Sequence, residues 1–330
     1  MGYKIRWDVG WSCKNYKYDQ AKGSETHRSH HFLILDASVQ RKMTNPCAMA
    51  ENPYHVRSIS LPTRSHPLAA TIEEDLEKLR CSEAFSQTTS AEAICSGLCS
   101  LGEVYDLVAE LLVLPQTQRV LAQTQNWVEE LLDGSVKLVD MCDATRNVLL
   151  QVKEDVKDLH SALRRRKGEL SMESKLRAYW SSRKKLRKEI RKHLEILKKM
   201  DGKTACSPLS DQEKHLQMVV RFLREVKSMT VSIFHSILSF ISSSPKTSKW
   251  SLISKLRLVN KVEQNGDEVG RVDLALSSLQ SHITEMKSVK HAQKQMEALE
   301  VRLDSLEGGV ERVFRRLIQT RVSLLNILTQ

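Results

Sequence analysis

Aromatic residues and prolines are scarce in this chain of 330 residues, and both shortages favour helices. Phe, Trp and Tyr together make up 5% of the sequence, so the side chains that enrich β-sheets are few. Four of the seven prolines lie before residue 68, which leaves long intervals free of helix breakers. Hydrophobic residues still reach 41%, enough to fill a core from aliphatic side chains. The composition therefore predicts an all-α fold.

The sequence also lacks the signatures of catalytic sites. It contains no G-x-S-x-G nucleophile motif, no G-x-x-x-x-G-K phosphate loop and no H-E-x-x-H zinc motif. Acidic pairs such as Glu73-Glu74 fall where helix caps and exposed helix faces are expected. Histidines occur singly on predicted helices, where a structural role is more common than catalysis. We expect no enzymatic activity, no catalytic residue and no cofactor.

Cysteines are seven, an odd number without C-x-x-C spacing, which indicates a reducing compartment. Cys95 and Cys99 share a face of a predicted helix, but no nearby His or Cys completes a metal-binding set, so packed thiols are expected there. The most apolar segment, residues 228–244, is shorter than the roughly 20 apolar residues of a membrane span. The polar first thirty residues exclude a secretory signal. An intracellular protein of the cytoplasm or nucleus is expected, with peripheral membrane association left open.

A helical apolar stripe organises the last third of the chain. From Val289 to Leu317 its positions recur in alternating steps of three and four residues, which is the pattern of a helix packed through one seam. The stripe consists of Val289, Ala292, Met296, Leu299, Leu303, Leu306, Val310, Val313 and Leu317. Residues 68–330 are therefore predicted to form an elongated antiparallel helical bundle with coiled-coil-like C-terminal helices.

Capping sequences and glycines give the expected helix boundaries. Thr71-Ile-Glu-Glu74 has the hydroxyl and carboxylate of a capping box and should open the first helix. Residues 210–213 repeat that pattern before another helix. Pro115 should start a helix that Gly134 ends. Gly308-Gly309 should weaken or bend the C-terminal helix.

Residues 1–67 have no sustained apolar stripe and are predicted to be a disordered, basic leader, of which the first 48 residues are a possible extension. Within it, Arg57, Ser60 and Pro62 match an R-S-x-S-x-P phosphopeptide pattern. Arg57 would recruit a basophilic kinase, and phosphorylated Ser60 would be bound by the arginine cluster of a 14-3-3 protein. The alternative is an unmodified linker.

The whole net charge of +11 comes from residues 164–203, which hold 16 basic and 5 acidic residues. Arg183 and Arg187 project close to the apolar stripe of this segment, so they should snorkel or pair with a carboxylate from another helix. The predicted basic face consists of Lys184, Lys185, Lys188, Arg191, Lys192 and Lys199. It suits nucleic acid, anionic lipid or nuclear import, and a simply solvated face is the plain alternative.

Three stretches resemble a plant-specific helical family related to the Bypass proteins: residues 55–68 (HVRSISLPTRSHPL), 249–255 (KWSLISK) and 314–328 (FRRLIQTRVSLLNIL). The resemblance covers about residues 53–330. It implies a plant protein linked to root and shoot development, with no established biochemical activity and no catalytic residues to transfer.

The sequence supports two alternative functions. The first is a noncatalytic interaction scaffold with protein partners of unknown identity. The second is a peripheral binder of anionic membranes or nucleic acid through residues 164–203.

Overall fold

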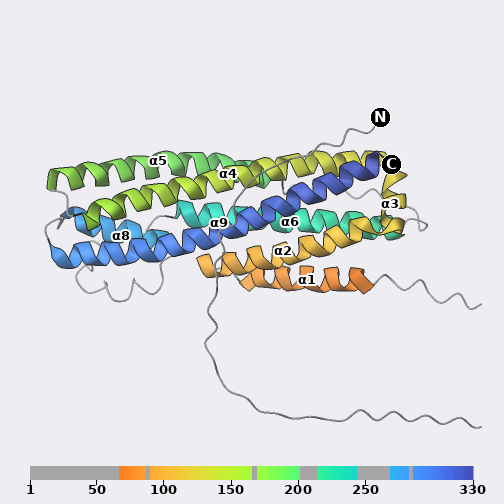
Figure 1. Cartoon of the computed structure of the whole chain (residues 1–330), viewed down its shortest axis with the longest axis horizontal. Helices are drawn as coiled ribbons and strands as arrows, with labels where there is room; N and C mark the ends of the chain where they lie inside the picture. Colours follow the sequence, from red (N-terminus) through yellow and green to blue (C-terminus); the bar gives the residue numbers. More distant parts are fainter. Residues whose placement is uncertain are drawn as a thin grey trace, which may run out of the picture. The chain divides into compact units, whose positions relative to one another are not determined.

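The computed structural model describes residues 67–85, 90–165, 169–200, 214–243, 268–281 and 285–329, all within one compact unit, Ser60–Gln330. In these ranges the chain forms helices and no strand, which confirms the all-α prediction (Figure 1). The helices are α1 (Pro67–Phe85), α2 (Ala91–Val113), α3 (Pro115–Ala122), α4 (Gln125–Arg164), α5 (Glu169–Met200), α6 (Lys214–Ser242), α8 (Glu268–Ser281) and α9 (Met286–Leu328).

The long helices form a bundle in which α9 packs along both α4 and α2 (Figure 1). α4 and α9 run antiparallel, as do α4 and α5. In contrast, α2 and α9 run parallel, because Arg302 pairs with Glu92 while Arg316, further along α9, pairs with Asp106. With 40 residues, α4 alone is about 60 Å long.

The predicted seam of α9 is confirmed and is longer than expected. Val289 is partly buried against the core, and the following seam positions are buried. The alternation of four and three residues continues past Leu317 through Thr320, Leu324 and Ile327. A strict heptad pattern therefore covers nearly the whole helix, so α9 buries one continuous seam against its neighbours, which include α2, α4 and α8.

Two predicted boundaries are wrong. Gly134 does not end a helix: α3 already ends at Ala122, and α4 runs through Gly134. A glycine inside a helix costs about 1 kcal/mol, and the buried stripe of α4 on both sides of Gly134 offsets it. Thr71 does not cap α1 either. The helix begins at Pro67, and the Thr71 hydroxyl donates to the Pro67 carbonyl from inside it.

The glycine pair in α9 has a packing role at one of its positions. The helix continues through Gly308 and Gly309 without interruption. A Cβ atom at Gly309 would lie 2.8 Å from Leu98 Cδ1 of α2, whereas one at Gly308 would meet nothing within 4 Å. Gly309 therefore allows α2 and α9 to approach closely.

Several predictions concern residues outside the described ranges. These are the leader predicted over residues 1–67, of which only Pro67 is described, as the first residue of α1, the capping box at 210–213 and the resembling stretch at 249–255. The sequence predicted coiled-coil-like C-terminal helices without a boundary between them, and the structure separates α8, a helix of 14 residues, from α9.

Candidate functional site

The basic helix α5 has one face in the core and one in solvent. Its buried side chains include Leu176, Leu186, Ile190 and Leu197. All six members of the predicted basic face are exposed: Lys184, Lys185, Lys188, Arg191, Lys192 and Lys199. Within the described part of the chain, no ion pair engages any of these six. The face therefore presents an excess of positive charge, with the exposed Glu195 among the basic residues, on a helix whose opposite face is packed in the core.

The two arginines next to the apolar stripe pair with a carboxylate of another helix. This was one of the two arrangements predicted for them, the other being snorkelling. Arg183 and Arg187 both donate to Oδ2 of Asp273 on α8, at 3.1 and 2.8 Å. The Tyr179 hydroxyl donates to Oδ1 at 2.9 Å. Arg183 and Asp273 are each 1% exposed, and Arg187 is 27% exposed. We call Tyr179, Arg183, Arg187 and Asp273 the Asp273 clasp.

The clasp also satisfies the end of α6. Arg183 donates to the Ile241 carbonyl at 2.8 Å, and Arg187 donates to the Ser243 carbonyl at 3.1 Å. The last carbonyls of a helix lack partners within it, so these guanidinium groups complete the α6 terminus. Burial, with the Asp273 charge beside it, raises the pKa of Tyr179 above its usual range. The tyrosine stays protonated at neutral pH and acts as a donor, so the clasp has a structural role.

Sequence reasoning missed Asp273 as the partner of the arginines. The signal was present, since Asp273 lies between residues at helical spacing that are buried in α8: Val269, Val272 and Leu276. An acidic residue inside such a stripe indicates a buried cation on a neighbouring helix.

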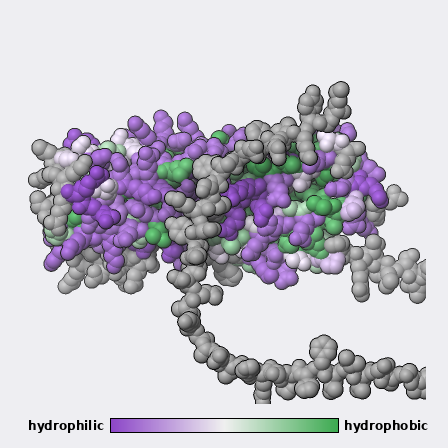
Figure 2. Space-filling model, viewed as in Figure 1, coloured by the Kyte–Doolittle hydropathy of each residue, from purple (hydrophilic) through white to green (hydrophobic). Residues whose placement is uncertain are grey.

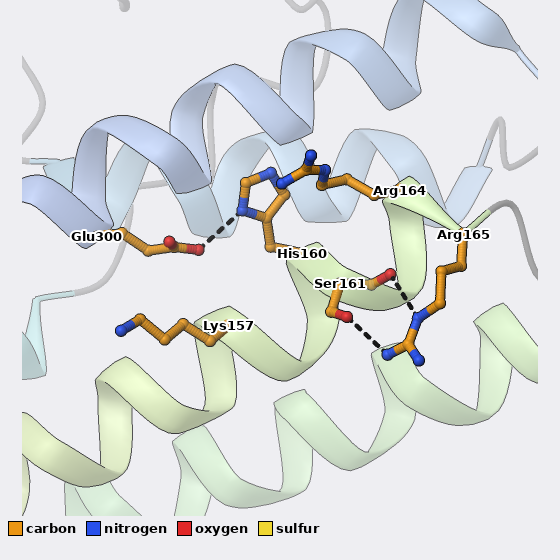
Figure 3. Close-up of a pocket in the computed structure, with 6 residues that line it drawn as sticks. All are labelled: Lys157, His160, Ser161, Arg164, Arg165 and Glu300. Atoms are coloured by element: carbon orange, nitrogen blue, oxygen red, sulfur yellow. Dashed lines mark hydrogen bonds and ion pairs between the residues drawn. The ribbon is translucent and has the colours of Figure 1, made fainter.

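An open depression of about 530 Å³ lies at the end of α4 (Figure 3). Its described lining consists of Lys157, His160, Ser161 and Arg164 of α4, the C-cap residue Arg165 that follows, and Glu300 of α9. We call these six residues the basic depression. His160 Nδ1 and Glu300 Oε1 lie 2.8 Å apart, and Arg165 donates to the Ser161 hydroxyl at 2.6 Å. The sequence predicted no site here.

Two further histidines, His215 and His235, lie on α6 and each contacts a hydroxyl group. His215 Nε2 lies 3.0 Å from the Thr117 hydroxyl, and His235 contacts Ser239 on its own helix. A second depression, of about 510 Å³, includes His193 with Asp140 and other residues of α4, α5 and α9. Across the described ranges, no cluster of three or more His, Cys, Asp or Glu side chains is arranged to hold a metal ion.

The predicted thiol pair lies on α2, where Cys95 is half-buried and Cys99 is exposed. Burial raises the pKa of the Cys95 thiol. Cys99 Sγ accepts a hydrogen bond from Arg312 of α9 at 3.6 Å. A third thiol, Cys142 of α4, is buried, and burial raises its pKa to about 12.

The phosphopeptide pattern of Arg57, Ser60 and Pro62 lies outside the described residues and stays a prediction. Among the helices that are described, none combines the length and apolar character needed to cross a bilayer. The face of the molecule in Figure 2 is mostly hydrophilic, with hydrophobic residues gathered in a few small areas.

Comparison with known proteins gives a family. Residues 97–327 match the family described as Protein BPS1, a span that runs from α2 to the last turn of α9. No curated protein and no solved structure matches the chain. The family match covers well over half of the sequence and agrees with the resemblance to Bypass-related proteins. The chain therefore belongs to the BPS1 family.

Proposed function

We propose that this protein is a noncatalytic helical scaffold that binds other proteins. The observation that supports it best is the use of buried polar side chains to join helices. The Tyr105 hydroxyl lies 2.8 Å from that of Thr230, which links α2 to α6, and Arg183 joins α5 to Asp273 of α8. Polar groups that are committed to fixed interhelical bonds stabilise a defined surface and leave no free acid, base or nucleophile among them.

The biological setting of this scaffold is root and shoot development, as the Bypass resemblance implies. Its protein partners are unidentified, and 14-3-3 proteins acting through phosphorylated Ser60 are one candidate. Affinity capture of the full-length protein from plant tissue at 0.15 and 0.5 M salt tests the proposal. A partner bound through apolar helix surfaces should be retained at both concentrations and should capture this protein in return. Recovery of no protein beyond those retained by an unrelated helical bundle would contradict the scaffold.

A second candidate function is peripheral binding to anionic membranes or nucleic acid through residues 164–203. The exposed basic face of α5, whose six cations form no ion pair with any residue that the structure describes, favours it specifically. Each lysine near an anionic membrane contributes about 1 kcal/mol to the free energy of binding. Each phosphate contact on duplex DNA makes the plot of log binding constant against log salt concentration steeper by roughly 0.9.

The chain offers a matched control for this test. Lys184, Lys188 and Lys192 can be changed to Gln together, and the control changes three exposed lysines of α9, Lys287, Lys290 and Lys294, by the same charge. Binding to anionic vesicles and to duplex DNA is then measured across a salt series. Loss only in the α5 variant supports the second function, and equal loss in both variants, or no binding at low salt, contradicts it.

A further inference from the structure

Two successive cations of α4, Arg146 and Lys153, pair with carboxylates of α9, and Arg146 lies 3.8 Å from Glu311. Lys153 lies 2.6 Å from Asp304 and 2.5 Å from Glu307. Burial opposes the charge of Lys153, but hydrogen bonds to these two acids prevail and raise its pKa. This lysine is neutralised within the protein.

The match ends at the basic depression. Among the described lining residues, Lys157 and Arg164 lie on the side of Glu300 and His160, Arg165 turns back onto Ser161, and Glu300 is the one carboxylate (Figure 3). Arg165 is hydrogen-bonded to the neutral Ser161, and in the described structure Lys157 and Arg164 have no ion pair. A concave surface with three cations and one carboxylate concentrates positive potential and attracts anions.

The sequence spacing holds these groups within reach of one small ligand. Positions 157, 161, 164 and 165 lie on one side of the helix within about 12 Å. Arginines bind phosphate with paired hydrogen bonds, lysine adds a point charge, and the Ser161 hydroxyl supplies a neutral donor. The volume of about 530 Å³ lies in the range of small-molecule sites, roughly 300 to 1,000 Å³.

We propose that the basic depression binds a small ligand that carries two or more phosphate groups. The described lining residues include no aromatic side chain on which a base would stack, so they favour a phosphorylated polyol over a nucleotide or single-stranded nucleic acid. Such a ligand replaces the missing carboxylates at the end of α4. This site lies outside the basic face of α5 and does not depend on a protein partner.

Calorimetric titration of the full-length protein with inositol hexakisphosphate tests this assignment. One molecule should bind per chain, and Lys157→Gln with Arg164→Gln should weaken binding at least ten-fold, because two charge-assisted contacts are lost. The matched control, Lys184→Gln with Lys188→Gln, removes the same charge from α5 and should change binding less than about three-fold. All four side chains are exposed, so thermal unfolding should be unchanged in both variants.

Glu300→Gln gives a test of opposite sign. The change removes the only carboxylate among the lining residues that the structure describes and keeps an oxygen for His160, so binding should strengthen a few-fold. Weaker binding would contradict the electrostatic basis. No binding of the probe, or equal weakening by the α4 and α5 double variants, would overturn the proposal.

Vesicles separate a lipid headgroup from a soluble ligand. Phosphatidylcholine vesicles with 5% phosphatidylinositol 4,5-bisphosphate should recruit the protein, and inositol hexakisphosphate should release it, if the ligand is a headgroup. Binding of the soluble probe without recruitment assigns the depression to a soluble phosphorylated polyol. Recruitment that the Lys157→Gln/Arg164→Gln variant retains in full would instead place lipid binding on the α5 face and count against the depression.

Discussion

Two contacts, the long interface of α4 with α9 and the short junction of α5 with α8, hold helices by different means. Along α9 the buried positions run from Ala292 to Ile327, and ion pairs such as Lys153 with Glu307 lie at the margin. At the junction the central contact is the Asp273 clasp, with Arg183 fully enclosed. A long apolar seam tolerates the loss of any single marginal charge, whereas the short junction depends on one carboxylate.

The difference follows from helix length. α8 has 14 residues, too few to be stable without tertiary contacts, while α9 has 43. A short helix that is held by apolar contacts alone can pack in several alternative registers along its neighbour. Two guanidinium groups that converge on one oxygen of Asp273 permit far fewer, so the clasp contributes specificity of position as well as stability.

The largest effect is expected from a charge placed in the α9 seam. Leu303 is completely buried, so Leu303→Asp should lower the free energy of unfolding by more than about 5 kcal/mol, because a buried carboxylate without a partner cannot be solvated. Urea unfolding followed by circular dichroism measures this. The control is Val301→Asp, two residues away and 60% exposed, which should change stability by less than about 0.5 kcal/mol. Similar losses of stability in both variants would contradict the burial of Leu303 in the α9 seam.

Removal of the clasp carboxylate should have the next largest effect. Asp273→Asn leaves Arg183 buried without its counter-ion and should cost about 3 to 5 kcal/mol. Asp158→Asn breaks the exposed pair with Lys175 and should cost at most about 1 kcal/mol. Chemical unfolding of the two variants compares the junction with an ordinary surface ion pair.

A double variant sharpens this result. Arg183→Met with Asp273→Leu removes both buried charges, and the partly exposed Arg187 can reach water. The double variant should recover at least half of the stability lost in Asp273→Asn. If it is instead as unstable as the single variant, the clasp stabilises through more than its charge pairing.

The neighbouring glycines of α9 should respond in opposite directions. Gly309→Ala should cost about 1 to 2 kcal/mol, because its Cβ atom would overlap Leu98, and Gly308→Ala should gain up to about 1 kcal/mol from helix propensity. Paired thermal melts of the two alanine variants measure the difference. Stabilisation by both substitutions would show that α2 and α9 can separate without loss.

A smaller effect is expected from pH at the α4–α9 interface. The pKa of Cys142 is raised from 9.0 to about 12 by burial, so the unfolded chain loses this proton first as pH rises. Stability should therefore fall above pH 9 by up to about 1.4 kcal/mol per pH unit from this thiol. Urea unfolding at pH 8, 9 and 10 should show a steeper fall for the wild type than for Cys142→Ala. Parallel curves would place the Cys142 thiol in contact with water.

Local periodicity allowed the helical fold to be predicted from the sequence. The roles of side chains that act through contacts between distant segments could not be predicted in this way. The seam of α9 is visible because its spacing belongs to a single helix, and the unusual position of Arg183 is visible for the same reason. Asp273 and Glu300 were not assigned, since their roles depend on which helices lie side by side. Gly134 was misjudged because a local propensity of about 1 kcal/mol was weighed without the packing of the whole of α4.

The parallel pairing of α2 with α9 also bears on how the chain is made. Cys99 and Arg312, which touch across this pair, are 213 residues apart in the sequence, and Cys142 and Val310 are 168 apart. During synthesis, α2 and α4 therefore emerge long before α9. Until α9 is made, the apolar faces that it covers on α2 and α4 stay exposed. A nascent chain that stops before α9 exposes those faces to other molecules, so dependence on chaperones should be greatest for products truncated before residue 286.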